Sequence, residues 1–196
     1  MTRKLFALAT TLSLSLLTAP ALADWQLVAQ ESHLSFASIK AGDVGEVHHF
    51  KGLDGAVKDD GSVSVEIDLA SVETLIDIRN ERMQKMLFNV ADFPLATIAG
   101  KVDLQQLEAL APGESAQTDV SMNLKLVGES NEIDAPLMIT RLSGKRVMVQ
   151  PVALVMLDAA DYDLLAGVEK LREIAGLDSI STAVPVSFTF VFEDGS

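Results

Sequence analysis

The chain has 196 residues, with 28 Asp and Glu against 15 Lys and Arg, and its formal net charge is −13 at neutral pH. An acidic surface of this strength repels phosphates, which argues against nucleic acid and anionic bilayers as partners. The chain contains no cysteine, so disulfides, thiol catalysis and thiolate metal ligands are excluded.

The N-terminus has the pattern of a secretory signal peptide. A basic pair precedes an apolar run over residues 5–17, and residues 21–23 read Ala-Leu-Ala, the small-x-small pattern of a cleavage site. We expect residues 1–23 to be removed and 24–196 to form one exported domain. The signal carries two basic and no acidic residues, so the mature net charge is −15. No run reaches the roughly 20 apolar residues of a membrane helix, so no stable membrane insertion is expected.

Strands are predicted first over residues 25–28 and 33–40. Residues 62–102 then change hydrophobic period twice. Residues 63–69 alternate between apolar and polar side chains, as in a strand with one buried face. From Ser71 the apolar spacing lengthens to three and four, which predicts a short helix that covers one opening of the sheet. After a Phe-Pro pair, alternation resumes at Ala96 and continues to Leu104, which predicts a returning strand.

The C-terminal half of the chain predicts further strands. Alternation over 120–126 and 133–139, with a turn at 128–131, predicts a hairpin. Residues 147–157 are apolar on both faces, and residues 184–192 place three phenylalanines on one face. The sequence therefore predicts an all-β protein with about eight antiparallel strands, which can close into a barrel.

The barrel interior has two interpretations. The expected inward positions include the small residues Ala96, Gly100, Ala135 and Ala153, which leave room for one small ligand. Alternatively, opposing Phe and Leu side chains fill that space, since protein cores usually pack densely. Periodicity alone does not decide between them.

A second helix is predicted over residues 164–174. Its apolar residues form a stripe at helical spacing, charged residues occupy the opposite face, and Gly176 is placed to cap the C-terminus. The polar face mixes both signs of charge and lacks the basic excess of a membrane-surface helix. We expect this helix to pack on the barrel or across its mouth.

The histidines are poor metal ligands in this arrangement. In a strand, His48 and His49 point to opposite faces, so a zinc site would need His33 and a carboxylate to converge on one of them. A solvated pair at a strand end is the favoured interpretation, and no metal site is predicted.

The acidic segment around residues 158–163 is a second candidate metal site. Asp158, Asp161 and Asp163 could hold calcium, but the segment lacks the glycine and the terminal Glu of an EF-hand loop. An exposed turn is therefore favoured here.

Arg79 and Arg82 lie one turn apart on the first predicted helix. They either grip an anionic ligand head at the cavity mouth or form intrahelical ion pairs, such as Asp77 with Arg82 or Arg79 with Glu81. Ion pairs are the favoured interpretation because such pairs are common on exposed helices.

Several segments in order resemble the YceI-like polyisoprenoid-binding family. These segments are Glu31-Ser32-His33-Leu34-Ser35-Phe36, Phe50 with Gly52 and Gly55, residues 65–74, residues 78–82, residues 87–89, Phe93-Pro94 with Ala96, and Leu124-Lys125-Leu126-Val127-Gly128. The resemblance implies a lipocalin-like extended β-barrel in a secreted or periplasmic protein. It also implies an elongated apolar cavity that holds the tail of an isoprenoid quinone or a similar lipid.

One segment departs from the family pattern. Residues 158–164 replace an Arg-Ser-x-Phe-Gly-like turn, so the resemblance leaves the tail length and head group open.

The resemblance and the alternation together give an expected site. The predicted cavity lining is Phe36, Val65, Ile67, Ile98, Val102, Leu124, Leu126, Phe188 and Phe190. Met83 and Met86 are expected to form a flexible lid, with Arg79 and Arg82 as head-group candidates.

The expected function is that of a non-enzymatic periplasmic carrier that sequesters a polyisoprenoid lipid. No cofactor is expected beyond the bound isoprenoid lipid or quinone, and a homodimer is compatible with exposed strand edges. An enzyme acting on an isoprenoid would need a polar group in the cavity, for which His33 is the nominee. The alternative is an exported interaction protein with a packed barrel that meets a membrane redox or envelope partner.

Overall fold

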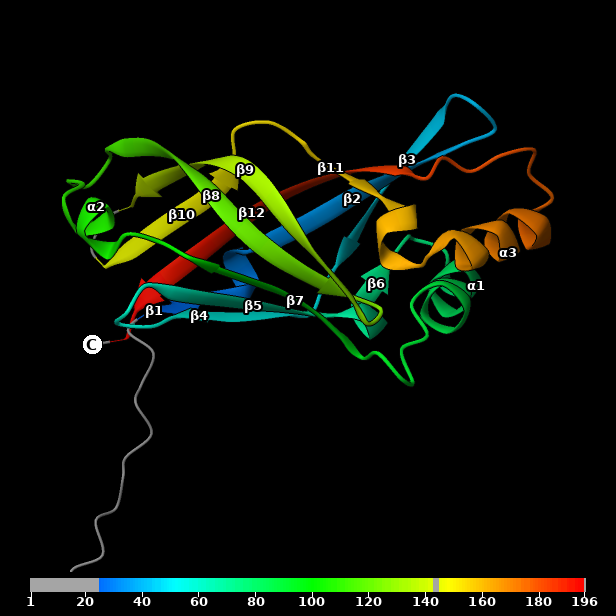
Figure 1. Cartoon of the computed structure of the whole chain (residues 1–196), viewed down its shortest axis with the longest axis horizontal. Helices are drawn as coiled ribbons and strands as arrows, with labels where there is room; N and C mark the ends of the chain where they lie inside the picture. Colours follow the sequence, from blue (N-terminus) through cyan, green and yellow to red (C-terminus); the bar gives the residue numbers. More distant parts are fainter. Residues whose placement is uncertain (1–24, 143–144, 196) are drawn as a thin grey trace, which may run out of the picture.

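Eight antiparallel strands form a closed ring in the computed structural model, which describes residues 25–142 and 145–195 (Figure 1). The ring runs in the order β1 (Trp25–Leu27), β4 (Leu53–Val57), β5 (Ser62–Asp68), β7 (Leu95–Lys101), β8 (Ser115–Leu126), β9 (Glu129–Arg141), β10 (Arg146–Pro151) and β12 (Ala183–Asp194), and β12 pairs back with β1. This confirms the predicted all-β barrel. The expected signal peptide lies outside the described residues.

The strand β12 belongs to both ends of the molecule. Its C-terminal half pairs with β1 and β10, and its N-terminal half pairs with β2 (His33–Lys40) and β11 (Val155–Asp158). Beyond β2 follow β3 (Val44–Phe50) and the short β6 (Val72–Glu73). Among the described residues, the strand pairing at this end stops at β6 and β11, so it does not close the barrel there.

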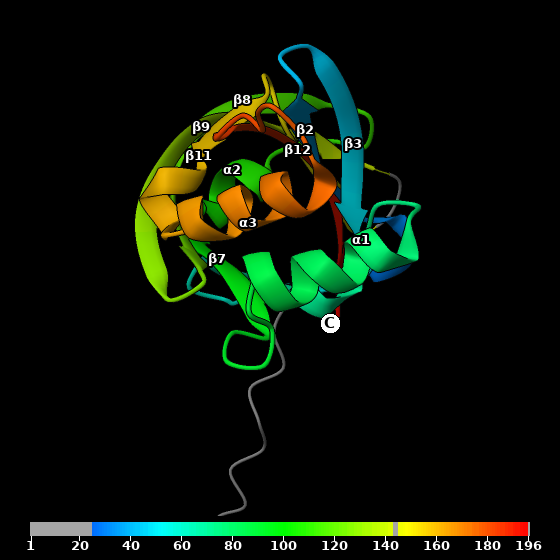
Figure 2. The same ribbon diagram turned by 90° about the vertical axis from the view of Figure 1, so that its right-hand side faces the viewer.

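Helices cover the end that the strands leave open. Figure 2 shows α1 (Asp77–Arg82) and α3 (Leu165–Ala175) lying side by side across this end. The π-helical turn η3 (Met83–Leu87) continues α1, and the 3-10 turn η4 (Ala159–Tyr162) precedes α3. The short helix α2 (Leu104–Glu108) lies at the opposite end (Figure 1). No helix in the described part of the chain is long and apolar enough to span a membrane.

Most predicted elements are confirmed within a few residues. The predicted strand over 33–40 is β2, and the helix over 164–174 is α3, which ends at Gly176 with a left-handed φ of 63°. The predicted strands over 63–69 and 184–192 correspond to β5 and β12. Each of these elements has a strong hydrophobic period and a clear stop signal.

The first predicted helix begins later than expected. Residues 72–73 form β6 and pair with β3, and the helix starts only at Asp77. Two features interrupt the helical spacing. Leu75 has a left-handed φ of 63°, and the Asn80 side chain accepts hydrogen bonds from the Thr74 backbone N–H and hydroxyl. The apolar spacing of three and four therefore extends through the loop at residues 74–76, before the helix begins.

Three other boundaries were wrong. The hairpin turn is Val127–Gly128, both with positive φ, and not 128–131, so β8 and β9 are longer than predicted. Residues 147–157 divide into β10 and β11. Leu104, expected to extend β7, begins α2 after Asp103 caps it through the Gln105 N–H.

A 3-10 turn separates β1 from β2, and beside it the backbone N–H of Val191 on β12 bonds to a side chain instead of to a strand. This turn, η1 (Ala29–Glu31), is followed by Ser32, whose side-chain oxygen accepts a hydrogen bond from the Val191 N–H at 3.0 Å. Ser32 is 5 % exposed. The hydroxyl therefore replaces a missing ladder bond inside the barrel wall.

We expect Ser32→Ala to lower the free energy of unfolding by about 1–3 kcal/mol, because the buried Val191 N–H loses its acceptor. Urea unfolding measures this change. Ser64→Ala, at an exposed position on β5, is the matched control and should change stability little. Equal stability of the two variants would show that the Ser32 bond is not needed.

Candidate functional site

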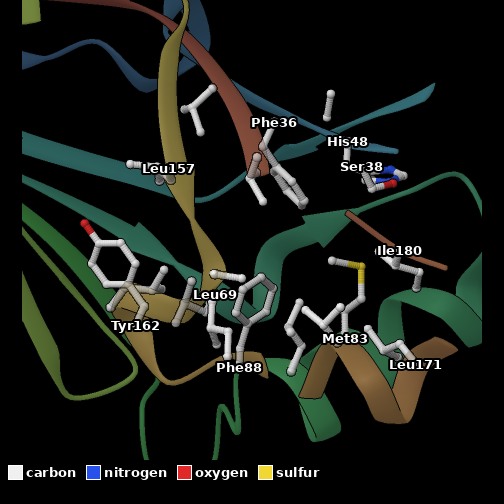
Figure 3. A pocket seen from close by; sticks show the side chains of 18 of the residues that line it. Phe36, Ser38, His48, Leu69, Met83, Phe88, Leu157, Tyr162, Leu171 and Ile180 are labelled. Carbon is white, nitrogen blue, oxygen red and sulfur yellow. The ribbon is translucent and has the colours of Figure 1, made fainter. Parts of the chain in front are cut away.

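A cavity of about 400 Å³ lies at the helix-covered end of the barrel. Its wall is almost entirely apolar and comes from strands, from η3 and from α3. The wall includes Leu34, Phe36, Phe50, Leu69, Ala96, Leu124, Met83, Phe88, Leu157, Tyr162, Leu164, Val168 and Leu171. In Figure 3, the aromatic side chains of Phe36, Phe88 and Tyr162 lie around this space. The volume is in the range that suits a small organic ligand.

The opposite end of the barrel is nearly filled. Only about 70 Å³ remains there, between Trp25, Leu107 and the phenylalanines of β12. The rings of Phe188 and Phe190 stack at 4.5 Å, and Arg141 lies over the Trp25 ring. The two interpretations of the interior thus apply to different ends, one hollow and one packed.

The structure divides the predicted lining residues between these two spaces. Those that border the large cavity are Phe36, Ile67, Ile98, Leu124 and Leu126. Val65, Val102, Phe188 and Phe190 instead border the small space at the packed end, and this corrects their expected position. Alternation assigns a residue to the inner face of a strand but not to a height along the barrel axis.

The two covering helices meet at a glycine. A Cβ atom on Gly167 of α3 would lie 2.7 Å from the Met86 carbonyl oxygen and 2.9 Å from the Leu87 Cα atom. Both neighbours are backbone atoms of η3, so they cannot move aside as a flexible side chain would. Gly167 therefore permits the close contact that joins α3 to η3.

The two predicted lid methionines have different positions. Met83 is 5 % exposed and lines the cavity opposite Phe36 (Figure 3). Met86 does not border the cavity: its side chain is 39 % exposed, and its carbonyl faces Gly167. Met86 therefore lies on the outer side of η3, and its lid role stays a prediction.

The cavity becomes polar near the β2–β3 hairpin. His48 is only 2 % exposed, and its Nε2 atom lies 2.9 Å from the Ser38 hydroxyl. Burial lowers the pKa of His48, and the Arg79 guanidinium lowers it further, so the imidazole is neutral at pH 7. The prediction of a solvated histidine pair was wrong for His48, whereas His49 on the opposite face is half-buried.

Arg79 forms a different ion pair from those predicted. Its guanidinium donates to Glu46 of β3 at 2.7 Å and to the Thr74 carbonyl at 2.6 Å. Lys40 reaches the same Glu46 oxygen at 2.7 Å. A hydrogen bond from Lys40, with the charge of Arg79, holds the pKa of Glu46 below its usual value. Arg79 therefore fixes α1 to the barrel wall.

Arg82, the other head-group candidate, is half-buried and borders the cavity. The predicted Asp77–Arg82 pair does not occur within the described residues, and no ion pair of Arg82 is found there.

The rim of the cavity is an ordered loop around Glu73. Its carboxylate accepts hydrogen bonds from the Lys51 ammonium, the Asn80 amide and the Leu75 N–H. Leu75 is 86 % exposed. The neighbouring Ile76 and Ile78 are exposed and also line the cavity, so the cavity reaches the surface here.

The acidic segment closes another part of the wall. The Asp158 side chain accepts from the Ala160 N–H and caps η4, and the Asn131 amide of β9 donates to the Asp161 carbonyl. The three Asp side chains are exposed, which confirms the predicted turn. In the part of the chain that the structure describes, no group of three His, Asp or Glu side chains could hold a metal ion.

Comparison with known proteins identifies the family. The model of the YceI-like domain matches residues 25–192. The chain belongs to the YceI-like domain family. A polyisoprenoid binding domain from Saccharophagus degradans, implicated in plant cell wall breakdown, is 43% identical over 88% of this chain and 99% of that chain, with a TM-score of 0.87. BcnA of Burkholderia cenocepacia shares the fold at 20% identity and a TM-score of 0.65, over 84% and 98% of the two chains. No curated protein matches the sequence.

We expect Gly167→Ala to destabilise the YceI-like barrel by about 1–3 kcal/mol, because the added methyl group separates α3 from η3. The free energy of unfolding in urea measures the effect. Lys170→Ala, on the exposed face of the same helix, should be nearly neutral. Unchanged stability of Gly167→Ala would show that the helices are not in close contact.

A pH-dependent loss of stability is expected from Glu73. Its hydrogen bonds, that from Lys51 above all, lower its pKa from 4.5 to about 2. A lowered folded-state pKa means that this contribution is complete above about pH 4.5 and is lost as the pH falls toward 2. Glu73→Gln should remove this part of the pH dependence in urea unfolding, whereas Glu66→Gln on the exposed face of β5 should retain it. Identical pH profiles for Glu73→Gln and the unmodified protein would contradict the assignment.

Proposed function

We propose that this protein is a periplasmic carrier that sequesters the tail of a polyisoprenoid lipid. The observation that carries the proposal is the apolar cavity of about 400 Å³ beneath α1 and α3. The relative from Saccharophagus degradans, a polyisoprenoid binding domain at 43% identity, supports the same ligand class. Export through the signal pattern at residues 1–23 is part of this proposal.

The chemistry of the cavity supports binding rather than catalysis. His33, the nominee for a catalytic group, is exposed on β2 and does not border the cavity. The half-buried Ser38 and the buried His48 are hydrogen-bonded to each other there, but His48 Nδ1 has no hydrogen-bond partner that would orient the ring as a general base. An apolar wall with few polar groups holds a ligand and fixes its orientation.

The helices that cover the open end would shield a bound tail from water. A prenyl tail that crosses an aqueous compartment must be shielded from water while it is carried, because its exposed apolar area is unfavourable in water. The α1–η3 segment and α3 provide that shield. They lie side by side across the open end of the barrel and are in close contact at Gly167. We propose that release requires these helices to separate.

The length of the bound tail and the oligomeric state of the protein are two further points of this proposal. The segment that departs from the family pattern supplies Ala159, Tyr162 and Leu164 to the cavity wall, so it contributes directly to the shape that a tail must fit. The homodimer expected from exposed strand edges is testable by the mass of the protein in solution.

Filling the cavity should abolish lipid binding. Ala96 on β7 lines the cavity and is 2 % exposed, so Ala96→Phe places a ring in the space that a tail would occupy. We expect binding of a prenyl lipid to fall at least about tenfold, which corresponds to about 1.4 kcal/mol. The readout is displacement of an apolar fluorescent dye by the lipid.

The matched control is Ala99→Phe, on the same strand but on the exposed face. It should bind lipid like the unmodified protein. Lipid binding that survives in a folded Ala96→Phe variant would contradict the proposed cavity. It would favour the alternative of an exported interaction protein.

A further inference from the structure

The inner faces of β2 and β3 change from apolar to polar toward the hairpin. On β2, Leu34 and Phe36 are followed on the same face by Ser38 and Lys40. The register pairs Phe36 with His48 and Ser38 with Glu46, so β3 continues the same gradient. The cavity therefore has an apolar body and one polar end, formed by Ser38, Lys40, Glu46, His48 and Arg79.

His48 has an unused hydrogen-bonding atom at this polar end. Its Nε2 atom is bonded to Ser38, whereas its Nδ1 atom is buried and has no hydrogen-bond partner. The ring packs edge-on against Phe36, with centroids 5.3 Å apart, so His48 lies where the aromatic wall ends. Buried polar atoms in native proteins are nearly always paired, and an unpaired one beside a cavity indicates a missing partner.

The chemistry of a neutral imidazole defines what that partner can be. One ring nitrogen donates a hydrogen bond and the other accepts one, and the Ser38 hydroxyl can take either role toward Nε2. The Nδ1 atom can therefore donate to a carbonyl oxygen or accept from a hydroxyl group. A carbonyl or hydroxyl oxygen of a neutral head group satisfies Nδ1 in one of these two ways, and an anionic oxygen satisfies it only as an acceptor.

We propose that the Ser38–His48 pair is a head-group subsite that binds a neutral carbonyl or hydroxyl oxygen at the end of an apolar tail. The inference rests on the proposed function, since the tail would occupy the apolar body of the same cavity. It also orients the ligand, with the head toward the β2–β3 hairpin and the tail between the strands and α3. Figure 3 shows Ser38 and His48 together at one side of the cavity, with Phe36 between them and its aromatic interior.

The cations beside the pair are already engaged. Glu46 lies two residues from His48 on the same face, and Lys40 and Arg79 both contact its carboxylate. An anion placed against His48 would have to compete with this carboxylate for the same two cations, whereas a neutral oxygen would not. The remaining buried donor of Arg79, its Nε atom, has no partner either and can serve the same neutral oxygen.

The competing interpretation is an anionic head held by Arg82. Arg82 borders the cavity and has no ion pair within the described residues. A carboxylate or phosphate on the tail would take this guanidinium as its partner. The experiment therefore includes an anionic probe.

Three probes that share one prenyl carbon skeleton separate these possibilities: the hydrocarbon, the alcohol and the carboxylic acid. Their dissociation constants are measured by displacement of an apolar fluorescent dye from the full-length mature protein. The variants are His48→Leu and Ser38→Ala, with His49→Leu on the opposite face of β3 as the matched control. Ser38→Ala tests the same subsite if His48→Leu does not fold.

We expect the alcohol-to-hydrocarbon affinity ratio to fall by about fivefold in His48→Leu, the value of one ordinary hydrogen bond, and to stay unchanged in His49→Leu. Hydrocarbon binding itself should persist in every folded variant. An unchanged ratio in both His48→Leu and Ser38→Ala would overturn the subsite while leaving the tail cavity intact. Preference for the acid that is lost in Arg82→Gln would overturn it in favour of an anionic head. Failure of the unmodified protein to bind any of the three probes would overturn the proposed function, and the subsite with it.

Discussion

The structure depends on a barrel that closes by strand pairing at one end only. β12 pairs with β1 and β10 near the closed end, but toward the other end its partners are β2 and β11, and the sheet then stops at β6. Backbone groups and apolar side chains at such an opening need another cover. The α1–η3 segment and α3 provide it, and the cavity lies directly beneath them.

The two ends of the barrel differ in packing: the closed end is densely packed and the open end contains the cavity. The closed end contains Trp25 and the stacked rings of Phe188 and Phe190, packed with little space between them. Dense packing of this kind stabilises the fold, since each buried aromatic ring removes a large apolar area from water. The open end can then remain hollow, and its helices are joined through the Gly167 contact and the Arg79–Glu46 ion pair.

Strand periodicity predicted the fold well but the site only in part. It identified β5, β7 and the faces of Ile67 and Ile98, because alternation is a local property that sequence displays directly. It could not place Phe188 at the packed end, because height along a barrel depends on register between distant strands. The burial of His48 was not predicted, because its polar residue type was taken to indicate exposure. Its alternation with Phe50 on one face of β3 is the signal that indicates an inward position.

We propose that the hollow end of this barrel holds a lipid tail. The direct test is native mass spectrometry of the mature protein purified from the export compartment of its own host, with organic extraction of the released molecule. The expected result is a stoichiometric prenyl lipid that carries a neutral oxygen head. A protein that has the apo mass, and that keeps this mass after incubation with isoprenoid quinones, would contradict it.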